Sequence, residues 1–178
     1  MKCCVSRAQN ISRMCLVCGR DNPLGLDARF YELDSGELLG VFQARDEHQS
    51  YPGRVHGGIA SAILDETIGR ALGLTEPDAW GVTIELHVKY RKPVPTGGEI
   101  RALARVTKSS KRIFEGTGEI VLDDGSVAVE ATGRYLRQPI ERIIEGDYAE
   151  DWLVDERERP AEIEVVKASR KRLDDERG

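Results

Sequence analysis

Residues 51–74, YPGRVHGGIASAILDETIGRALGL, combine a glycine-rich entry with the apolar spacing of a buried helix. Apolar side chains recur at i, i+3 and i+4, which is typical of a helix that packs one face on a core. They are Ala60, Ile63, Leu64, Ile68, Ala71 and Leu72. We expect the helix to end near Gly73, which suits a left-handed C-cap. The remaining chain then has to supply the surface against which this helix packs.

The two ends of the predicted helix carry different chemistry. Gly57 and Gly58 leave the first unpaired amides open to a bound oxygen that becomes an anion during reaction. Asp65 lies at the margin of the apolar face, and Glu66 is turned about 100° away, towards solvent or a partner. Gly57 and Asp65 are separated by about 12 Å along one helix. If both act on one bond, the second group must come from another copy of the chain, across a two-fold interface.

Runs of alternating polarity predict strands on both sides of this helix. We expect them over residues 26–33, 37–44, 79–91, 98–108, 111–122 and 126–138. Tight hairpins are predicted at Asp34-Ser-Gly, at Ser109-Ser110 and at Asp123-Asp124-Gly125. In the strand over 79–91, alternation places Thr83 on one face with Glu85 and His87. Two strands, a helix and four meandering strands indicate an α+β domain with a mostly antiparallel sheet that can wrap the helix.

Several spaced motifs carry a family resemblance. They are His56-Gly57-Gly58 followed by Asp65, Gly81-Val-Thr-Ile-Glu-Leu, Tyr90-Arg-Lys-Pro-Val-Pro, Cys15-Leu-Val-Cys-Gly and Asn22-Pro-Leu-Gly-Leu. Together, over roughly residues 15–138, the chain resembles the hotdog-fold acyl-CoA thioesterases of the phenylacetate-type (PaaI-like) family. The leader resembles the branch that contains the mammalian thioesterase superfamily members. The resemblance implies a hotdog fold, with an antiparallel sheet around one central helix, and a dimer or larger homo-oligomer.

The resemblance also implies hydrolysis of an acyl-CoA thioester to a free acid and CoA at a composite site in the dimer interface. The Gly57 amide would stabilise the oxyanion, and His56 would orient the glycine loop. Asp65 would activate a water held by Thr83 or attack the thioester directly, and both routes stay open. No metal is expected, and no cofactor apart from the CoA of the substrate.

Substrate contacts are expected at two places. Ser50 stands where the family often has an asparagine, and Gly58 lies beside the thioester. Basic side chains at strand ends would bind the CoA phosphates, and the turn 108–112 is the best candidate for this phosphate-binding site. They are Lys89, Arg91, Lys92, Lys108, Lys111 and Arg112, with Ser109 in the same turn. A solvated basic surface is the alternative interpretation.

Composition limits the remaining possibilities. With 178 residues, 40% hydrophobic and 32% charged, the chain is expected to be one soluble domain. No run approaches the ~20 apolar residues of a membrane span, and the N-terminus has no apolar signal region. The net charge of −5 argues against nucleic acid as a partner. A cytoplasmic location is the expectation.

Three parts of the chain differ in character. Residues 1–25 form a leader that contains all four cysteines. Cys15-x-x-Cys18 has half the ligands of a zinc site. The main interpretation of the four cysteines is that they are ordinary thiols in a reducing compartment. Residues 26–138 are the hotdog domain. Residues 139–178 form an acidic extension that accounts for the net charge. In it we expect an amphipathic helix over 140–154, then a solvated helix or disordered tail.

Two other functions stay open from the sequence. A non-catalytic hotdog protein could bind or sense acyl-CoA, with a site loosened at Ser50. A hotdog hydratase or dehydratase would need an Asp/His pair in a different arrangement. Catalysis by hydrolysis predicts that Asp65 is indispensable.

Overall fold

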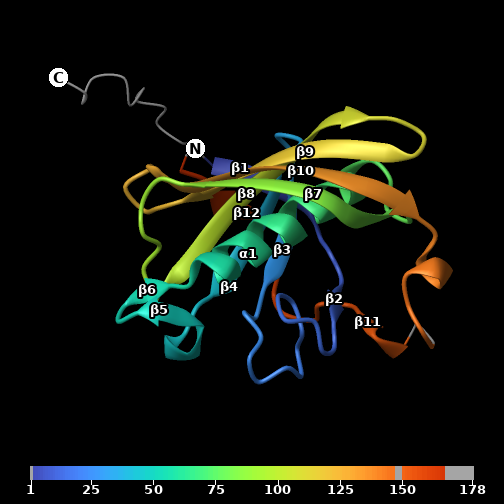
Figure 1. Ribbon diagram of the computed structural model, residues 1–178. Helices are drawn as coiled ribbons and strands as arrows, with labels where there is room; N and C mark the ends of the chain where they lie inside the picture. The colour runs from blue at the N-terminus through green and yellow to red at the C-terminus, as the bar shows by residue number, and fades with distance from the viewer. Residues whose placement is uncertain (1, 147–149, 167–178) are drawn as a thin grey trace.

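The computed structural model describes residues 2–146 and 150–166 and shows an antiparallel sheet curved over one long helix (Figure 1). The eight strands of this sheet follow the order β12-β1-β3-β4-β8-β9-β10-β7. Helix α1, Gly57–Arg70, lies against β10, β7, β8, β9 and β4. The predicted hotdog architecture is therefore confirmed.

Six of the eight strands of the main sheet lie close to the predicted ranges, and β1 and β12 were not predicted. The eight strands are β1 Lys2–Ala8, β3 Arg29–Leu33, β4 Leu38–Gln43, β7 Trp80–Tyr90, β8 Glu99–Ser109, β9 Ile113–Val121, β10 Val127–Gln138 and β12 Glu162–Glu164. Two small sheets pair β5 Gln49–Tyr51 with β6 Arg54–Val55, and β2 Ile11–Ser12 with β11 Trp152–Leu153. Three short 3-10 helices are η1 Asp46–His48, η2 Ala71–Leu74 and η3 Ile140–Arg142. The three predicted hairpins are confirmed as the β3–β4, β8–β9 and β9–β10 connections.

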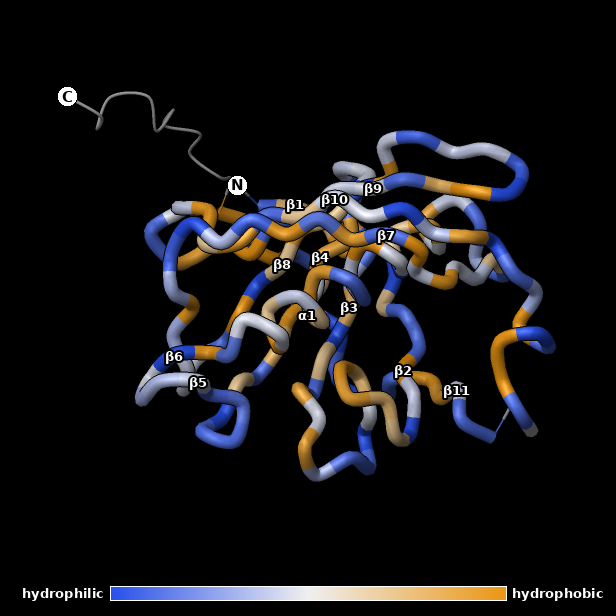
Figure 2. Tube along the Cα trace, in the orientation of Figure 1, coloured by the Kyte–Doolittle hydropathy of each residue, from blue (hydrophilic) through white to orange (hydrophobic). Residues whose placement is uncertain are grey.

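The apolar face of α1 packs on the concave side of the sheet. Ile63, Leu64 and Ile68 are fully buried, as the periodicity predicted. A Cβ atom on Gly116 of β9 would lie 2.6 Å from the Cγ2 atom of Ile68. The helix approaches β9 this closely because no side chain intervenes there. Hydrophobic and hydrophilic residues alternate along parts of the strands (Figure 2).

The helix ends differently from the prediction. α1 stops at Arg70, and the chain continues directly into the 3-10 helix η2. Gly73 does not have a positive φ angle, so the predicted left-handed C-cap is wrong. The Thr75 N–H donates to the Leu72 carbonyl oxygen at 3.1 Å, and the tighter winding thereby satisfies a carbonyl at the helix end.

The convex side of the sheet is covered by both ends of the chain. Strand β1, which the sequence analysis did not identify, pairs with β3 on one side and β12 on the other. Side chains from these strands and their neighbours form a second buried group, here called the outer-face cluster. It consists of Cys3, Val5, Tyr31, Leu33, Leu39, Val41, Leu103 and Val165.

The C-terminal extension is not the helix that was expected over 140–154. Its described residues contain the short η3 and the strand β11, which pairs with β2 of the leader. Beyond residue 155, β12 adds a strand to the main sheet, so the expectation of a solvated helix or tail is wrong for residues 162–164. Residues 167–178 lie outside the described part. Among the described residues, no helix has the length and apolar character needed to cross a bilayer.

Candidate active site

The Asp65 carboxylate is held by two hydroxyl groups. Thr83 Oγ1 donates a hydrogen bond to Asp65 Oδ1 at 2.8 Å. Tyr135 Oη reaches the same oxygen at 3.2 Å and the Asp65 carbonyl oxygen at 3.1 Å. The carboxylate projects from α1, whereas the hydroxyls come from β7 and β10, the last two strands at one edge of the sheet. Helix and sheet edge together therefore position one acidic group.

Burial governs the acidity of Asp65. Desolvation raises the pKa of this carboxyl above its ordinary value, and the hydrogen bonds from Thr83 and Tyr135 offset part of that rise. The nearby charge of Glu66 adds a smaller increase in the pKa. A carboxylate with a raised pKa is a stronger base than an exposed aspartate once it has ionised. The environment therefore suits proton abstraction from a water.

A β-bulge decides where Thr83 points. Across β7 and β10, Tyr135 is opposite Thr83 while Arg134 is opposite Glu85, so Ile84 is an extra residue on β7. Residues directly opposite each other share a face of the sheet. Thr83 therefore faces inward with Tyr135, whereas Glu85 bonds outward to Arg134 at 3.1 Å. The prediction that Thr83 shares a face with Glu85 and His87 is wrong, because the bulge interrupts the alternation.

Tyr135 is the functional residue that the sequence analysis missed. Its side chain is 1% exposed, and its ring stacks on Phe114 with the centroids 4.9 Å apart. A Cβ atom on Gly133 would lie 2.6 Å from the Tyr135 ring, so that glycine leaves the space which the ring occupies. Burial and the charge of Asp65 raise the pKa of Tyr135, so its hydroxyl stays protonated as a donor. An aromatic residue with a polar tip in a core strand was the available signal.

The start of α1 presents amide groups. His56 is the N-cap, and its Nδ1 atom accepts from the Gly58 N–H at 2.9 Å. His56 therefore hydrogen-bonds its own loop at the helix entry. Within the described residues the Gly57 N–H has no acceptor, and it lies at the positive end of the helix dipole. This amide can bind an oxyanion.

Tyr90 and Ser61 surround Gly57, and the sequence analysis did not assign them a role. Tyr90 Oη donates to the Gly57 carbonyl oxygen at 3.0 Å and lies 2.6 Å from Ser61 Oγ. A Cβ atom on Gly57 would be 3.4 Å from the Tyr90 ring. Tyr90 thus fixes the first turn of α1 from the far end of β7.

The loop before α1 is held by a buried histidine that was also missed. His48 is 4% exposed; its Nδ1 atom accepts from the Arg45 N–H at 3.0 Å, and its Nε2 atom contacts the Leu24 carbonyl oxygen at 2.8 Å. The His56 N–H donates to the His48 carbonyl oxygen at 2.9 Å. Ser50, on β5 in the same loop, is exposed.

The expected phosphate-binding residues fall into two groups in one subunit. Lys89 and Arg91 lie at the Tyr90 end of β7, where both contact Glu130, and Lys92 pairs with Asp124. The turn 108–112 lies near the opposite end of β7, because β8 and β9 pair Ser109 with Phe114 and Phe114 is opposite Tyr135. Arg137 pins this turn by donating to Ser109 Oγ at 2.7 Å. A single subunit does not bring the two groups together.

A cavity of about 620 Å³ opens beside Asp65. Asp65, Thr83 and Tyr135 form one part of its wall, and Trp80 and Trp152 form another. Residues of the C-terminal extension, among them Ile143 and Ile144, also contribute to the lining. The cavity gives the carboxylate a space in which a small molecule can lie.

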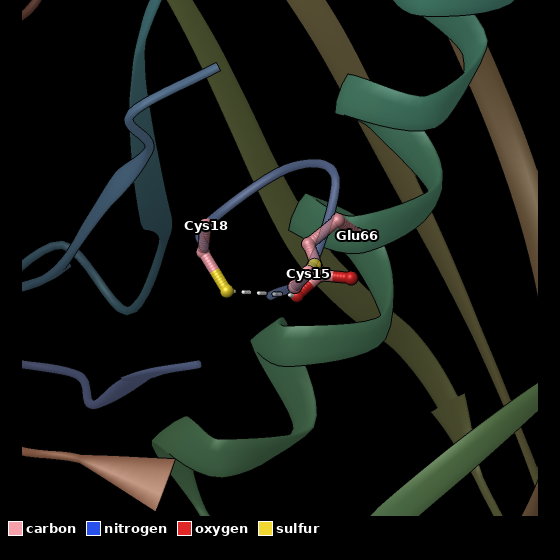
Figure 3. A group of neighbouring side chains, drawn as sticks. All are labelled: Cys15, Cys18 and Glu66. Atoms are coloured by element: carbon pink, nitrogen blue, oxygen red, sulfur yellow. Dashed lines mark hydrogen bonds between the residues drawn. The ribbon is translucent and has the colours of Figure 1, made fainter. Parts of the chain in front are cut away.

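One group of side chains has the composition of a metal site. The ligand atoms of Cys15, Cys18 and Glu66 all lie within 4.8 Å of one another (Figure 3). Glu66 was expected to face solvent or a partner, which is wrong, because it faces the leader of its own chain. Arg70 Nε donates to Glu66 Oε1 at 2.6 Å, so a cation already balances this carboxylate.

Helix and sheet together form a hotdog fold, and the acidic group lies where α1 meets the edge of the sheet. Residues 52–129, somewhat less than half of the chain, match the thioesterase superfamily. The match contains the glycine-rich entry, all of α1, Asp65 and Thr83, and ends inside β10 before Tyr135.

Two curated relatives of the chain are named as acyl-coenzyme A thioesterases. Human acyl-coenzyme A thioesterase 13 is 30% identical over 78 residues, which are 44% of this chain and 56% of that protein. Mouse acyl-coenzyme A thioesterase THEM4 is 27% identical over 135 residues, which are 75% of this chain and 55% of that protein. The chain spans about half the length of these curated relatives. A crystal structure of a thioesterase superfamily protein superimposes with a TM-score of 0.63 and 26% identity, over 71% of this chain and 61% of that one.

Proposed function

We propose that the protein hydrolyses acyl-CoA thioesters to a free acid and CoA at a site composed by two subunits. The observation that carries the proposal is the hydrogen bond of 2.8 Å between Thr83 and Asp65 in the wall of the cavity. The relatives named acyl-coenzyme A thioesterases support the same chemistry. Residues 52–129, which match the superfamily, include the proposed base and the proposed oxyanion-binding amide.

In the proposed reaction, Asp65 removes a proton from a water positioned by Thr83, and the water oxygen attacks the thioester carbonyl carbon. The Gly57 N–H, at the positive end of α1, binds the oxyanion of the tetrahedral intermediate. The intermediate then expels the CoA thiolate, which takes up a proton. Direct attack by Asp65 through an anhydride is the second route. A single turnover in ¹⁸O-labelled water distinguishes the routes, since hydrolysis of an anhydride can place the label in Asp65.

The two-subunit arrangement follows from distance and from the sheet edge. Gly57 and Asp65 are separated by about 12 Å along α1. Strand β7 pairs only with β10 among the described strands, and its Val82 and Ile84 side chains are 39% and 49% exposed. An edge strand with exposed apolar groups is a template for pairing with another chain. We infer that two β7 strands pair across a two-fold axis.

Such pairing would complete the site. In an antiparallel pair, residues at equal distances from the axis lie opposite each other. An axis near Leu86 places the Thr83 end of one strand beside the Tyr90 end of the other. Because Tyr90 contacts Gly57, the Asp65 of one subunit would then lie near the Gly57 amide of the other. The turn 108–112 would likewise approach Lys89 and Arg91 across the interface and could bind CoA phosphates with them.

Mixed dimers test the proposal directly. Asp65→Asn removes the base and keeps the shape, and we expect at least about a 100-fold loss of hydrolysis. Gly57→Pro deletes the oxyanion-binding N–H at the first helical position, where proline is compatible with a helix. His56 already has the extended conformation, with φ −62° and ψ 137°, that a residue before proline requires.

Each variant alone should release almost no thiol from acyl-CoA. When the two are co-expressed, each mixed dimer regains one intact pair of Gly57 and Asp65, and about a quarter of wild-type activity should return for random assembly. A site within one subunit would show no such recovery. Binding of acyl-CoA by the wild type without release of thiol would instead identify a non-catalytic acyl-CoA-binding protein.

A further inference from the structure

The segment Cys15-Leu-Val-Cys18 forms a tight turn of the leader against the second half of α1. The Gly19 N–H donates to the Cys15 carbonyl oxygen at 2.8 Å, which closes the turn. Backbone N–H groups reach both sulfurs, from Val17 to Cys15 Sγ at 3.3 Å and from Ser12 to Cys18 Sγ at 3.4 Å. The two cysteine side chains converge towards Glu66 (Figure 3). The turn thus holds two sulfurs within 4.8 Å of each other.

Arg70 supplies positive charge to this pair. Its Nη2 atom donates to Cys18 Sγ at 3.1 Å, and its Nε atom donates to Glu66 Oε1 at 2.6 Å. The guanidinium lies over the rings of Phe30 and Trp152, at 4.4 and 4.8 Å from their centroids. An arginine enclosed by aromatic rings needs anionic partners, and the Cys18 thiolate with the Glu66 carboxylate can provide them.

The two thiols differ in acidity. A hydrogen bond from Cys15, with support from the Arg70 charge, lowers the pKa of Cys18 to about 7. The same hydrogen bond, together with burial and the Glu66 charge, raises the pKa of Cys15. With a pKa of about 7, a substantial fraction of Cys18 is thiolate near neutral pH, beside a protonated Cys15. This is the charge state from which thiol–disulfide exchange starts.

Access to the pair is restricted to one side. Cys18 is 1% exposed, whereas Cys15 is partly exposed and lines the cavity of about 620 Å³ that also contains Asp65. Cys3 and Cys4 lie on β1, and Cys3 belongs to the outer-face cluster. A small reagent can therefore reach Cys15 through the cavity.

The surroundings favour redox chemistry over a metal at this position. Cys15, Cys18 and Glu66 offer three ligand atoms, whereas a structural zinc ion takes four. Arg70 already bonds to two of these three ligands, so a metal ion would compete with a buried cation. Two sulfurs within 4.8 Å of each other need only an oxidant to form a disulfide.

We propose that Cys15 and Cys18 are a reversible dithiol–disulfide pair that exchanges with low-molecular-weight disulfides entering through the cavity. Cys15 transfers its proton to Cys18 and attacks one sulfur of the oxidant, and a thiolate leaves. Cys18 then loses the proton and attacks Cys15 Sγ, and the second thiolate leaves. The cysteines lose two electrons, and the oxidant is reduced to one thiol and one thiolate. The proposal does not depend on thioester hydrolysis.

The test uses the full chain in glutathione buffers of increasing disulfide content, followed by acid quenching, alkylation and peptide mapping. We expect the peptide with Cys15 and Cys18 to lose two hydrogen atoms, and Cys3 and Cys4 to remain alkylated in the same buffers. Dithiothreitol should restore both thiols. Alkylation of Cys15 and Cys18 in every buffer, with the protein folded by circular dichroism, would overturn the proposal.

Two variants sharpen the result. In Cys18→Ser the second step is lost, so Cys15 should stop as a mixed disulfide with glutathione. The matched control Cys4→Ser, at an exposed position on β1, should oxidise as the wild type does.

Metal analysis after incubation with zinc chloride tests the competing interpretation, a metal site. One bound zinc ion per chain that protects the pair from oxidation and is lost in Cys18→Ser would identify a metal site and reject the redox pair.

Discussion

At the scale of single residues, the proposed chemistry depends on how Asp65 is solvated. Burial raises its pKa, and two hydroxyl donors moderate the rise. For an acid whose folded-state pKa is raised, the stabilising contribution is present at low pH and is lost as the pH rises through the folded pKa. The ionised carboxylate therefore lowers the free energy of unfolding at neutral pH. Asp65→Asn should lose activity and have a thermal midpoint equal to or above that of the wild type.

The Thr83 hydroxyl is expected to matter for rate rather than for folding. Thr83→Val keeps the shape of the side chain and removes the bond of 2.8 Å to Asp65, so kcat should fall about 10- to 100-fold. Thr83→Ser retains the hydroxyl and should stay within a few-fold of the wild type. Steady-state kinetics with thiol detection measure both variants. Equal rates for Thr83→Val and Thr83→Ser would remove the hydroxyl from the mechanism.

Tyr135 is expected to control the pH dependence of hydrolysis. Its hydrogen bond lowers the pKa of Asp65, so Tyr135→Phe should raise that pKa further. Because only the ionised carboxylate acts as base, the acid limb of kcat/KM should move to higher pH. Phenylalanine keeps the stacking on Phe114. Tyr90→Phe removes a hydroxyl that contacts Gly57 and not Asp65, and it should leave the acid limb in place. A pH profile unchanged in Tyr135→Phe would contradict this role.

At the scale of elements, the edge strand β7 has two tasks. Its bulge turns Thr83 inward to Asp65, while Val82 and Ile84 remain exposed along the unpaired side. A bulge re-aims a side chain at the cost of one unpaired residue in the ladder. The same local irregularity therefore forms the site and leaves an apolar edge for association.

A charge on this edge should separate the subunits. Ile84→Lys places an ammonium where two β7 strands would pair, and charged edges block strand pairing. The folded subunit should tolerate it, since surface substitutions usually change stability by about 0.5 kcal/mol or less. Light scattering should show a monomer, and thioester hydrolysis should be lost. Val154→Lys, at a side chain 69% exposed and outside β7, is the control and should keep both assembly and activity. An active monomer would contradict the composite site.

At the scale of the whole molecule, the two chain ends complete the fold. β1 and β12 extend the sheet, and Val165, just after β12, is 3% exposed in the outer-face cluster. The leader also pairs with β11, and residues of the extension line the cavity beside Asp65. The leader and the extension are therefore parts of one packed unit in the described structure.

Truncating Val165 should test this packing. Val165→Ala removes buried methyl groups from the outer-face cluster and should lower the free energy of unfolding by about 2 kcal/mol. Its neighbour Val166 is only partly buried, so Val166→Ala should cost less. Urea denaturation measures both. The KM for acyl-CoA should stay unchanged because the cluster lies on the convex side of the sheet. Equal stability of the two variants would mean that the C-terminal strand adds little to the fold.

Local patterns in the sequence were sufficient for much of this architecture. Helical spacing predicted α1, alternation predicted six strands, and the glycines around His56 predicted an open helix entry. These features depend on residues close together in the chain, where backbone geometry relates spacing directly to position. They placed Gly57 and Asp65 eight residues apart on one helix.

Contacts between segments that are distant in the sequence became apparent only in the tertiary structure. The inward direction of Thr83 depends on a bulge formed with β10, which strict alternation cannot indicate. Tyr135 reaches Asp65 across 70 positions of the chain, and Arg70 meets Cys18 across 52. Residues 2–8 and 162–164 became strands because partner strands were available for their backbone hydrogen bonds. Such pairings depend on which surfaces meet in the folded chain, so the spacing of nearby residues in the sequence does not predict them.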